Sequence, residues 1–434
     1  MTGAQEPGVM YTKQLRIAAL AERFPQRAFT SLAHNIDAQW LKTAYLMTRR
    51  DGAVGIDGQT ADDFVRDFEA NIQRLLEEAK SGRYRAPPVR RVHIPKGDGR
   101  TTRPIGIPTF EDKVLQRAVV ALLEPLYEHD FRDVSYGFRP GRSAHQAIKT
   151  VWDGLSSMGG GWVIDLDIQA FFDTIDHQHL RAFLQQRVKD GVILRLIGKW
   201  LKAGVMEAGQ WQRGKVGSPQ GGVISPMLAN VYLHYVLDEW FEKDVKPRLR
   251  GRAFSVRFAD DAVLAFSNEA DARKVLEVLP KRFARFGLTL HPAKTRLVRF
   301  RPHREQRAET FDFLGFTHYW GKSRRGRWII KQKTAKDRFR RALRHISLWC
   351  RANRHLPLQV QHRHLCRKVQ GHFAYYGICN NGRALQVFRF RVIWYWIKWL
   401  SRRSQKGWIT WEKAGQLLAR LPLPRARVVH RWSF

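Results

Sequence analysis

Two adjacent aspartates interrupt a stretch of strand-forming sequence, "SVRFADDAVLAFS" at residues 255–267. Aspartate is depleted inside strands and enriched at turns, whereas the valine, leucine and phenylalanine on either side suit a sheet. Asp260 and Asp261 are therefore expected at or beside the tip of a β-hairpin. Taken alone, such a pair is most often a polar turn, and its chemistry depends on what else the chain brings to it.

A second pair of carboxylates stands in "VIDLDIQAFFDTI" at residues 163–175, where Asp165 and Asp167 interrupt an apolar strand. Strand alternation places both on one face, and a buried carboxylate is costly without a cation or hydrogen-bond partners. Two acidic strands in a strongly basic chain suggest a divalent metal, and hard oxygen ligands suit Mg²⁺. Two such ions about 3.5–4 Å apart can activate an attacking hydroxyl and stabilise a leaving pyrophosphate. That chemistry is nucleotidyl transfer.

The overall charge indicates a polyanionic partner. The 434 residues include 76 Lys plus Arg against 39 Asp plus Glu, a net charge of +37. A charge of this size repels itself unless a polyanion binds, and nucleic acid is the leading candidate. An anionic membrane surface is the competing partner, but no apolar run reaches the roughly 18 residues of a spanning helix, and the N-terminus has no apolar signal region. We expect a cytoplasmic protein with no membrane role.

Most of this charge lies in the last part of the chain. Residues 321–434 contain 28 Lys plus Arg and two acidic residues, a net charge of +26, together with eight of the 15 tryptophans. Interleaved basic and aromatic residues are better explained by phosphate contacts with base stacking, or by a small aromatic core, than by a solvated helix face. "KDRFRRALRHISLWCRAN" at 336–353 places apolar residues at helical spacing. We interpret residues 321–434 as a mostly helical basic domain.

Strands alternate with helices in the part of the chain before it. Two strands are predicted in "RRVHIPKGDGRTTRPIGIP" at 90–108 and a long helix in "EDKVLQRAVVALLEPLYEHD" at 111–130. "GGVISPMLANVYLHYVLDEWFEKDV" at 221–245 begins with a glycine-rich turn and becomes a helix. This order, followed by the aspartate hairpin, indicates an α/β unit centred on a small sheet.

From about residue 50 to about residue 320 the chain resembles the group II intron-encoded reverse transcriptases/maturases, and it resembles them more loosely to its C-terminus. Any one motif is weak, but coincidence is implausible for a series that follows the family's order. The series is "GAVGIDGQT" (52–60), "IPKGDGRTTRPIGIP" (94–108), "VSYGFRPGRSAHQA" (134–147), "DIQAFF" (167–172), "GSPQGGVISPMLANVYL" (217–233), "RFADD" (257–261), "GLTLHPAKT" (287–295), "FDFLGF" (311–316), "HFAYYGICNN" (372–381) and "SQKGWITW" (404–411).

The resemblance implies a right-hand polymerase fold. Fingers and palm of the α/β class, with a small antiparallel sheet, would occupy residues 1–320, and an α-helical, RNA-binding thumb and maturase domain would occupy residues 321–434. The implied partners are a structured RNA, most simply a group II intron RNA, an RNA template with a DNA primer, and deoxynucleoside triphosphates. The implied location is the bacterial cytoplasm, with association to the nucleoid when the protein is bound to DNA.

The resemblance also assigns metal ligands. The first catalytic aspartate falls on Asp167 and the others on Asp260 and Asp261, which together would hold two Mg²⁺ ions. Asp165 is then a structural neighbour of the site and not a ligand.

Four further residues receive substrate roles from the same resemblance. Lys96 and Arg103 on the fingertip strands would clamp the incoming triphosphate, Arg in a bidentate fork. Gln220 and its neighbouring glycines would let the backbone approach the nucleotide and template. Lys294 would protonate the leaving pyrophosphate as general acid. The alternatives without a catalytic role are that Lys96 and Arg103 are solvated charges of a hairpin and that Lys294 is an ordinary surface lysine.

The resemblance also places Phe172, five residues after Asp167, under the nucleotide sugar, where its ring would clash with a ribose 2′-hydroxyl. The alternative is that Phe172 is a core residue, and neighbouring Phe171 should point elsewhere. Asp173 and Asp176 are expected to be helix-start acids.

The chain departs from the family in two places. Phe258 stands where tyrosine is usual before Ala-Asp-Asp, which removes a hydroxyl but keeps the ring. Many relatives continue beyond this length into a DNA-binding segment and a Cys- and His-bearing endonuclease, as the compact bacterial members do not. From this sequence we do not expect the protein to cut its own DNA target.

The function that the sequence favours is an RNA-directed DNA polymerase that binds a structured group II intron RNA, assists its splicing and copies it into DNA by two-metal nucleotidyl transfer. One alternative is a non-catalytic RNA-binding splicing cofactor, against which the intact aspartates argue. The other is a domesticated relative acting in host defence, DNA repair or CRISPR adaptation, which the catalytic core cannot distinguish from the intron role. The retron-type and diversity-generating branches fit less well, because "QGGVISP" carries the intron-type ending.

Overall fold

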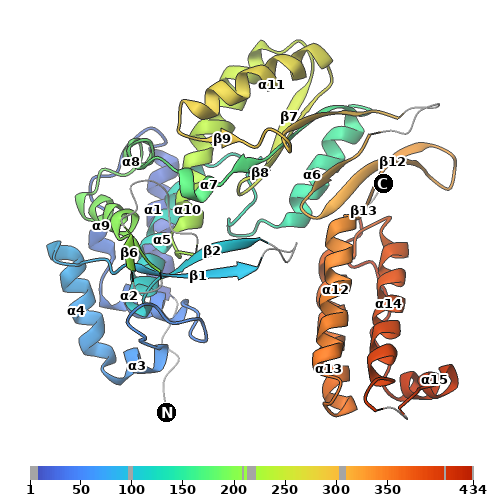
Figure 1. Cartoon of the computed structure of the whole chain (residues 1–434). Coiled ribbons are helices and arrows are strands. Elements are labelled where there is room, and N and C mark those ends of the chain that lie inside the picture. The colour runs from blue at the N-terminus through green and yellow to red at the C-terminus, as the bar shows by residue number, and fades with distance from the viewer. Residues whose placement is uncertain are drawn as a thin grey trace. The chain divides into compact units, whose positions relative to one another are not determined.

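The computed structural model describes residues 8–95, 101–207, 210–212, 221–302, 309–404 and 407–432 (Figure 1). The chain forms two compact units, each discontinuous in sequence. The first unit comprises Met1–Ala147, Leu166–Leu264 and Ala270–Arg296, and the second comprises Ile148–Asp165, Ala265–Glu269 and Leu297–Phe434. The predicted domain boundary at residue 320 stays a prediction.

One long buried helix organises the first unit. The helices of its N-terminal half are α1 (Gly8–Arg23), η1 (Ala33–Asn35), α2 (Ala38–Leu46), α3 (Ala61–Arg66), α4 (Phe68–Ser81) and α5 (Phe110–Asp130). Helices α1, α2 and α3 pack on α5, which is the long helix that the sequence predicted. The Trp40 indole N–H donates to the Ala118 carbonyl at 3.0 Å, and the Gln14 amide donates to the Ala121 carbonyl at 2.8 Å. These bonds satisfy polar groups that would otherwise be costly in an apolar core.

The fingertip strands belong to a four-stranded sheet of this unit. Its strands are β1 (Val89–Pro95), β2 (Thr102–Ile107), β5 (Val205–Glu207) and β6 (Gln210–Gln212), in the order β2-β1-β5-β6. β1 is antiparallel to β2 and parallel to β5, and β5 is antiparallel to β6. The two strands predicted at 90–108 are thus present, and the turn expected between them lies outside the described residues.

A second four-stranded sheet carries the predicted carboxylates. Its strands are β3 (Gly161–Leu166), β7 (Ala253–Phe258), β8 (Asp261–Phe266) and β10 (Arg296–Phe300), in the order β10-β3-β8-β7. A Cβ atom on Gly161 would lie 2.2 Å from the Phe266 carbonyl oxygen, so the start of β3 lies beside the end of β8. The two strands are therefore antiparallel, and the end of β3 lies beside the start of β8. A short ladder of β4 (Ile168–Gln169) and β9 (Thr289–Leu290) follows.

The helical elements that follow β4, up to β9, are α7 (Phe171–Thr174), α8 (His177–Gln185), α9 (Gly191–Lys202), α10 (Ser225–Leu233), η2 (His234–Asp238), η3 (Phe241–Val245), η4 (Lys246–Arg248) and α11 (Glu269–Ala284). The helix predicted after the glycine-rich turn is α10, but it continues as the two π-helical segments η2 and η3. A π-helical segment adds a residue to a turn and rotates every later side chain. Apolar periodicity alone does not reveal that rotation.

The second unit is mostly helical, as the sequence predicted for residues 321–434. Its elements are α6 (Ala144–Ser157), β11 (Phe311–Phe313), β12 (Phe316–Lys322), β13 (Trp328–Thr334), α12 (Lys336–Ala352), α13 (Leu358–Tyr376), α14 (Gly382–Leu400) and α15 (Trp411–Arg420). β11, β12 and β13 form an antiparallel sheet, and the sequence did not predict β13. Helices α12, α13 and α14 run side by side (Figure 1) around a core that includes Leu365, Phe388 and Trp396. Among the described residues, no helix has the length and apolar character needed to cross a bilayer.

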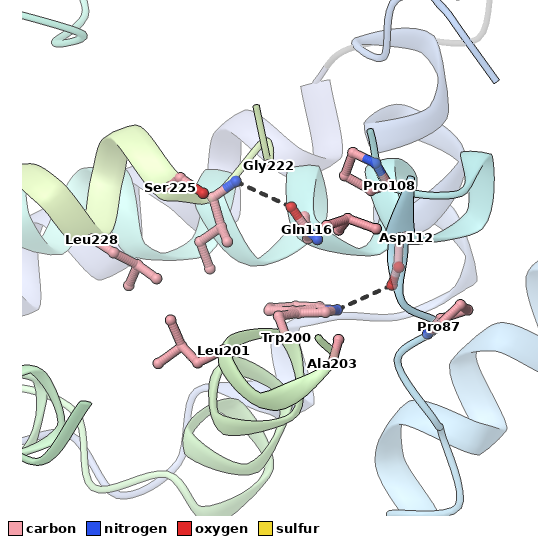
Figure 2. Close-up of a pocket in the computed structure, with 12 residues that line it drawn as sticks. Pro87, Pro108, Asp112, Gln116, Trp200, Leu201, Ala203, Gly222, Ser225 and Leu228 are labelled. Carbon is pink, nitrogen blue, oxygen red and sulfur yellow. Dashed lines mark hydrogen bonds between the residues drawn. The ribbon is translucent and has the colours of Figure 1, made fainter. Parts of the chain in front are cut away.

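Asp112 is a carboxylic acid buried inside the first unit. It is 2% exposed, and its side chain accepts a hydrogen bond from the Trp200 indole N–H at 3.1 Å (Figure 2). It accepts another from the Tyr84 hydroxyl. Burial raises the pKa of Asp112 to about 7, although the Trp200 bond opposes the rise. The folded protein therefore keeps this carboxyl protonated in a pH range where the unfolded chain has released the proton.

The pH dependence of stability tests this burial. Between about pH 4 and pH 7 the unfolded state binds fewer protons than the folded state, so Asp112 makes the free energy of unfolding fall as pH rises, by up to about 1.4 kcal/mol per pH unit. Asp112→Asn keeps the hydrogen-bond acceptor and removes the titration. Urea unfolding should show the variant gaining stability over wild type across this window.

A matched variant is Asp190→Asn. Burial raises the pKa of Asp190, but backbone N–H donors, including those of Leu32 and Ala33, lower it to below its ordinary value. The stability that Asp190 contributes is present above the unfolded pKa near 4 and is lost only as pH falls through the lower folded pKa. The difference in the free energy of unfolding between Asp190→Asn and wild type should therefore stay constant from pH 5 to pH 7. If the difference in the free energy of unfolding between Asp112→Asn and wild type were also constant over this range, the raised pKa of Asp112 would be contradicted.

Candidate active site

The two adjacent aspartates stand at the turn between β7 and β8. Only Ala259 and Asp260 separate the end of β7 from Asp261, the first residue of β8. Ala259 has a φ of 57°, in the left-handed region that few residues with a side chain adopt. Asp260 is half-buried and Asp261 is exposed. The hairpin thus presents two carboxylates at one end of the sheet.

Asp167 lies between β3 and β4, just outside the ladder in which the sequence placed it. Its carbonyl accepts the His291 N–H at 2.8 Å, and its own N–H lies 3.3 Å from the Thr295 hydroxyl oxygen. The Lys294 ammonium lies 3.0 Å from the Asp167 carboxylate. The segment after β9 therefore holds the backbone of Asp167 and supplies a cation to its side chain.

The strand directions bring the three predicted metal ligands to the same end of the sheet. β3 ends one residue before Asp167, and β8 begins at Asp261 beside it. Within the described ranges, however, no three His, Cys, Asp or Glu side chains are close enough to share one ion. The donor set still fits a divalent metal, because it consists of hard carboxylate oxygens and the Asp167 side chain is 32% exposed. The predicted acid Lys294 balances the charge of Asp167.

The two phenylalanines after Asp167 have different surroundings. Phe171 is buried, with 2% of its surface exposed, and its ring lies 6.5 Å from that of Tyr232. Phe172 is only half-buried. Ala170, with a φ of 47°, turns the chain between β4 and α7 just before them. Phe171 is therefore a core residue, and Phe172 keeps a face that a substrate can touch. Asp176, as predicted, caps a helix: it accepts the Gln178 and His179 N–H groups of α8 at 2.8 Å each.

The glycine-rich turn packs directly on a fingertip strand. Gly221 has a φ of 111°, and a Cβ atom on it would lie 2.6 Å from the Gly106 carbonyl oxygen of β2. Gln116 of α5 accepts the Ile224 N–H just after the turn at 3.3 Å (Figure 2). β2 also carries Arg103, which is exposed and stands opposite Ile94. The predicted residues Lys96 and Gln220 lie outside the described residues.

The enclosed space behind this turn is small. A cavity of about 10 Å³ is lined by residues that include Asp112, Gln116, Trp200, Gly222 and Ser225 (Figure 2). A volume of this size holds about one water molecule. The cavity is therefore a packing feature beneath the turn and cannot contain a nucleotide.

The sequence did not predict a role for three buried polar residues that connect the hairpin to the neighbouring helix. Arg257, inside β7, is 1% exposed and contacts Asp238 and Asn230. A charged residue in an otherwise buried strand must have a partner. Asn230 and Asp238 are polar residues eight apart in an apolar helical stretch, close to two turns, and that coincidence was the available signal.

The motifs, the sheet and the carboxylate hairpin match one protein family. The family model described as reverse transcriptase (RNA-dependent DNA polymerase) matches residues 94–318, just over half of the chain. The chain therefore belongs to the reverse transcriptase family, which confirms the predicted right-hand polymerase fold. Members of this family use divalent metal ions and act on nucleic acid, in agreement with the cofactor and partner classes that the sequence indicated.

Within this family the chain is similar to proteins encoded in introns. It is 39% identical over 239 residues to group II intron-encoded protein LtrA of Lactococcus lactis subsp. cremoris, a match that covers 52% of this chain and 39% of that protein. It is 38% identical over 228 residues to protein YkfC of Escherichia coli (strain K12), covering 51% of this chain and 60% of that protein. An uncharacterized 91 kDa protein in the cob intron of Schizosaccharomyces pombe is 27% identical over 408 residues, covering 78% and 49%. The match to LtrA confirms the predicted resemblance to group II intron reverse transcriptases/maturases, and this chain spans less than two thirds of each of these relatives.

The burial difference between the two phenylalanines predicts their effect on sugar choice. Phe172→Val should admit ribonucleotides into the product while deoxynucleotide addition survives in part, because the smaller side chain relieves an overlap worth roughly 1–3 kcal/mol. Single-nucleotide incorporation of matched ribo- and deoxyribonucleotides on an RNA template measures the ratio. Phe171→Val is the control, since it should lower stability and leave selectivity alone. If the ratio of ribonucleotide to deoxyribonucleotide incorporation were unchanged in a folded, active Phe172→Val protein, Phe172 would be a core residue with no role in sugar choice.

Proposed function

We propose that this protein is an RNA-directed DNA polymerase that binds a structured group II intron RNA, assists its splicing and copies it into DNA. The observation that supports the proposal is the position of Asp167 just after β3 and of Asp260 and Asp261 at the start of the neighbouring strand β8, in a chain of the reverse transcriptase family. The similarity to LtrA favours an intron RNA as the natural substrate. The proposed cofactor is a pair of Mg²⁺ ions, and the proposed location is the bacterial cytoplasm, with the nucleoid when DNA is bound.

The residues of the site suit nucleotidyl transfer. Bound Mg²⁺ would supply Lewis-acid activation of the primer hydroxyl and charge neutralisation at the leaving pyrophosphate. Asp167 and Asp260 would hold the ions, with Asp261 beside them on the hairpin. Lys294, 61% exposed on its long side chain, can leave Asp167 and donate its proton to the leaving group. Its pairing with Asp167 keeps it within reach of that position.

Other residues would orient the substrate. Arg103 lies on β2, against which the glycine-rich turn packs through Gly221, so the triphosphate and the base would be held by neighbouring parts of the first unit. Lys96 and Gln220 are proposed to complete this grip. The half-buried ring of Phe172 would exclude a ribose 2′-hydroxyl.

The second unit would supply most of the RNA affinity. Residues 321–434 hold +26 of the net charge of +37, and Trp408 and Trp411 are 78% and 65% exposed. Tryptophans this exposed are rare in a soluble fold, and base stacking gives them a use in a basic surface. The surface thus combines phosphate contacts with stacking platforms.

The carboxylates provide the direct test of catalysis. Asp167→Asn and Asp260→Asn should each lower Mg²⁺-dependent primer extension by roughly 10³-fold or more, because a lost metal ligand removes several kcal/mol of charge stabilisation. RNA binding, measured by filter retention, should be retained. Asp62→Asn, the same chemical change at an exposed site on α3, should behave as wild type. Extension near the wild-type rate by either site variant would refute the assignment, and splicing without extension in wild type would favour a non-catalytic splicing cofactor.

A second prediction concerns the charge of the helical region. Removing residues from about 321 onward would split the sheet of β11, β12 and β13, so substitution is the cleaner test. Changing four exposed arginines of α12 and α13 (Arg340, Arg344, Arg363 and Arg367) to Gln should weaken RNA binding. The slope of log affinity against log salt should become shallower by roughly 0.7–0.9 for each phosphate that the variant no longer neutralises.

The control removes the same charge from the first unit, by changing the exposed Lys80, Arg181, Lys189 and Lys202 to Gln. This variant should bind RNA more tightly than the α12 and α13 variant, with a slope closer to wild type. Equal reductions of affinity in the two variants would mean that net charge, and not this surface, determines RNA binding.

A further inference from the structure

Arg257 is a cation sealed inside the first unit directly before the carboxylate turn. It is 1% exposed and stands three residues before Asp260. Its Nε and Nη2 atoms donate to the Asp238 carboxylate at 2.8 Å and 2.6 Å, and Asp238 is itself 1% exposed. Its Nη1 atom donates to the Asn230 side-chain oxygen at 2.9 Å and to the Ala259 carbonyl at 3.0 Å. The guanidinium therefore forms hydrogen bonds with three separate acceptors.

Each acceptor belongs to a different part of the site. Asn230 lies on α10, the helix that begins after the glycine-rich turn, and Asp238 lies on the π-helical segment η2. Ala259 is the left-handed residue of the hairpin tip. Arg257 thus joins the hairpin to the helix that follows the proposed nucleotide-binding turn. A planar guanidinium with a fixed fork of donors can do this, whereas an ammonium cannot reproduce the geometry.

The same network includes the segment that precedes α6. The backbone N–H of Arg257 donates to the Val134 carbonyl at 2.7 Å, and the backbone N–H of Tyr136 donates to the Arg257 carbonyl at 2.8 Å. The Asn230 amide donates to the Gly137 carbonyl at 2.7 Å. A Cβ atom on Gly137 would lie 2.3 Å from the Ala259 nitrogen, so the backbone of this segment contacts the hairpin turn directly.

The contacts at Ala259 hold the backbone that leads into Asp260. A residue with a side chain adopts a φ near 57° only when its surroundings impose it. Here the Arg257 hydrogen bond fixes the Ala259 carbonyl and Gly137 closes on its nitrogen. The next residue is Asp260, so these contacts restrict the backbone from which its side chain extends.

We propose that Arg257 is a positioning residue for nucleotidyl transfer: through the Ala259 carbonyl it sets the Asp260 carboxylate against Asp167, and through Asn230 and Asp238 it ties that hairpin to α10. This inference rests on the proposed polymerase function and names a residue beyond the metal ligands. Arg257 itself touches no substrate, since it is buried beneath the turn.

The chain provides a matched control in a second buried ion pair. Arg187 and Asp130, with 4% and 11% of their side chains exposed, lie 2.7 Å apart in the same unit. Arg187 also donates to the Phe24 and Arg27 carbonyls. None of these partners adjoins a carboxylate of the site. Arg187→Lys therefore disturbs a comparable buried pair without reaching the hairpin.

The experiment compares Arg257→Lys with Arg187→Lys in the full chain. Single-nucleotide extension on an RNA template with saturating Mg²⁺ gives kcat and the KM for the deoxynucleotide. We expect Arg257→Lys to lower kcat by about 10²-fold, the effect typical of a misplacement near 1 Å, with a smaller change in KM because the interaction acts in the transition state. Arg187→Lys should retain kcat at a similar decrease in Tm.

A second variant separates positioning from stability. Arg257→Met combined with Asp238→Leu replaces the buried ion pair by apolar side chains, a change that is often neutral for folding. We expect this double variant to regain Tm relative to either single change and to keep the low kcat, because nothing then holds the Ala259 carbonyl. A double variant with wild-type kcat would overturn the proposal.

A readout independent of polymerisation follows the metal itself. Fe²⁺ in place of Mg²⁺, with ascorbate and peroxide, generates radicals at the bound ion and cleaves the neighbouring backbone. Wild type and Arg187→Lys should be cut beside Asp167 and Asp260, and Arg257→Lys should lose or relocate the cut at Asp260. If wild type extends no primer, the proposed function fails, and this cleavage still decides the positioning role. The positioning role would be overturned if Arg257→Lys and Arg187→Lys showed the same cleavage and the same kcat. It would also be overturned if neither wild type nor either variant were cleaved.

Discussion

The arrangement of the site depends on one charge held away from water. A buried arginine is tolerated only when its donors find acceptors, and removing one partner of such a pair typically costs about 3–5 kcal/mol. Arg257 meets this demand with Asp238, Asn230 and the Ala259 carbonyl. Because those acceptors lie on η2, α10 and the hairpin tip, the requirement to satisfy one guanidinium fixes three elements together. The turn carries two adjacent carboxylates, Asp260 and Asp261, and such support opposes the repulsion between their like charges.

The Asp167 carboxylate is held in place by a different set of contacts. Asp167 lies where β3 has ended, and the segment after β9 takes over its backbone through His291 while Lys294 balances its charge. The two halves of the proposed metal site are thus fixed independently, one by a buried ion pair and one by a backbone ladder with an exposed lysine. The exposed partner can move when a stronger cation arrives, and the buried one cannot. This asymmetry suits a site in which the ligands must stay in place while a proton donor leaves and returns.

The sequence predicted the elements that depend on local pattern, and it failed where long-range partners decide. The aspartate hairpin, the fingertip strands, α5 and α12 follow from alternation, turn residues and helical spacing. The placement of Asp167 outside β3 does not, because the backbone of Asp167 pairs with His291, a residue far away in the chain. Arg257 was missed because its partners Asp238 and Asn230 lie 19 and 27 residues earlier in the chain, beyond the reach of a local strand pattern. Strand β13 was missed because residues 321–434 were interpreted together as mostly helical, although its Trp-Ile-Ile start is itself typical of a strand. Roles carried over from the family, such as those of Lys96 and Gln220, depend on residues whose positions this structure does not describe.

The most direct test of the account is a crystal structure of the full chain with Mn²⁺, an RNA template, a DNA primer and a non-reactive deoxynucleotide analogue. Anomalous scattering would locate the ions without reference to the side chains. We expect manganese peaks in contact with both Asp167 and Asp260, Lys294 released from Asp167, and Arg257 still bonded to the carbonyl of a left-handed Ala259. Manganese bound elsewhere, or bound at Asp167 and Asp260 with the Arg257 bonds broken, would contradict it.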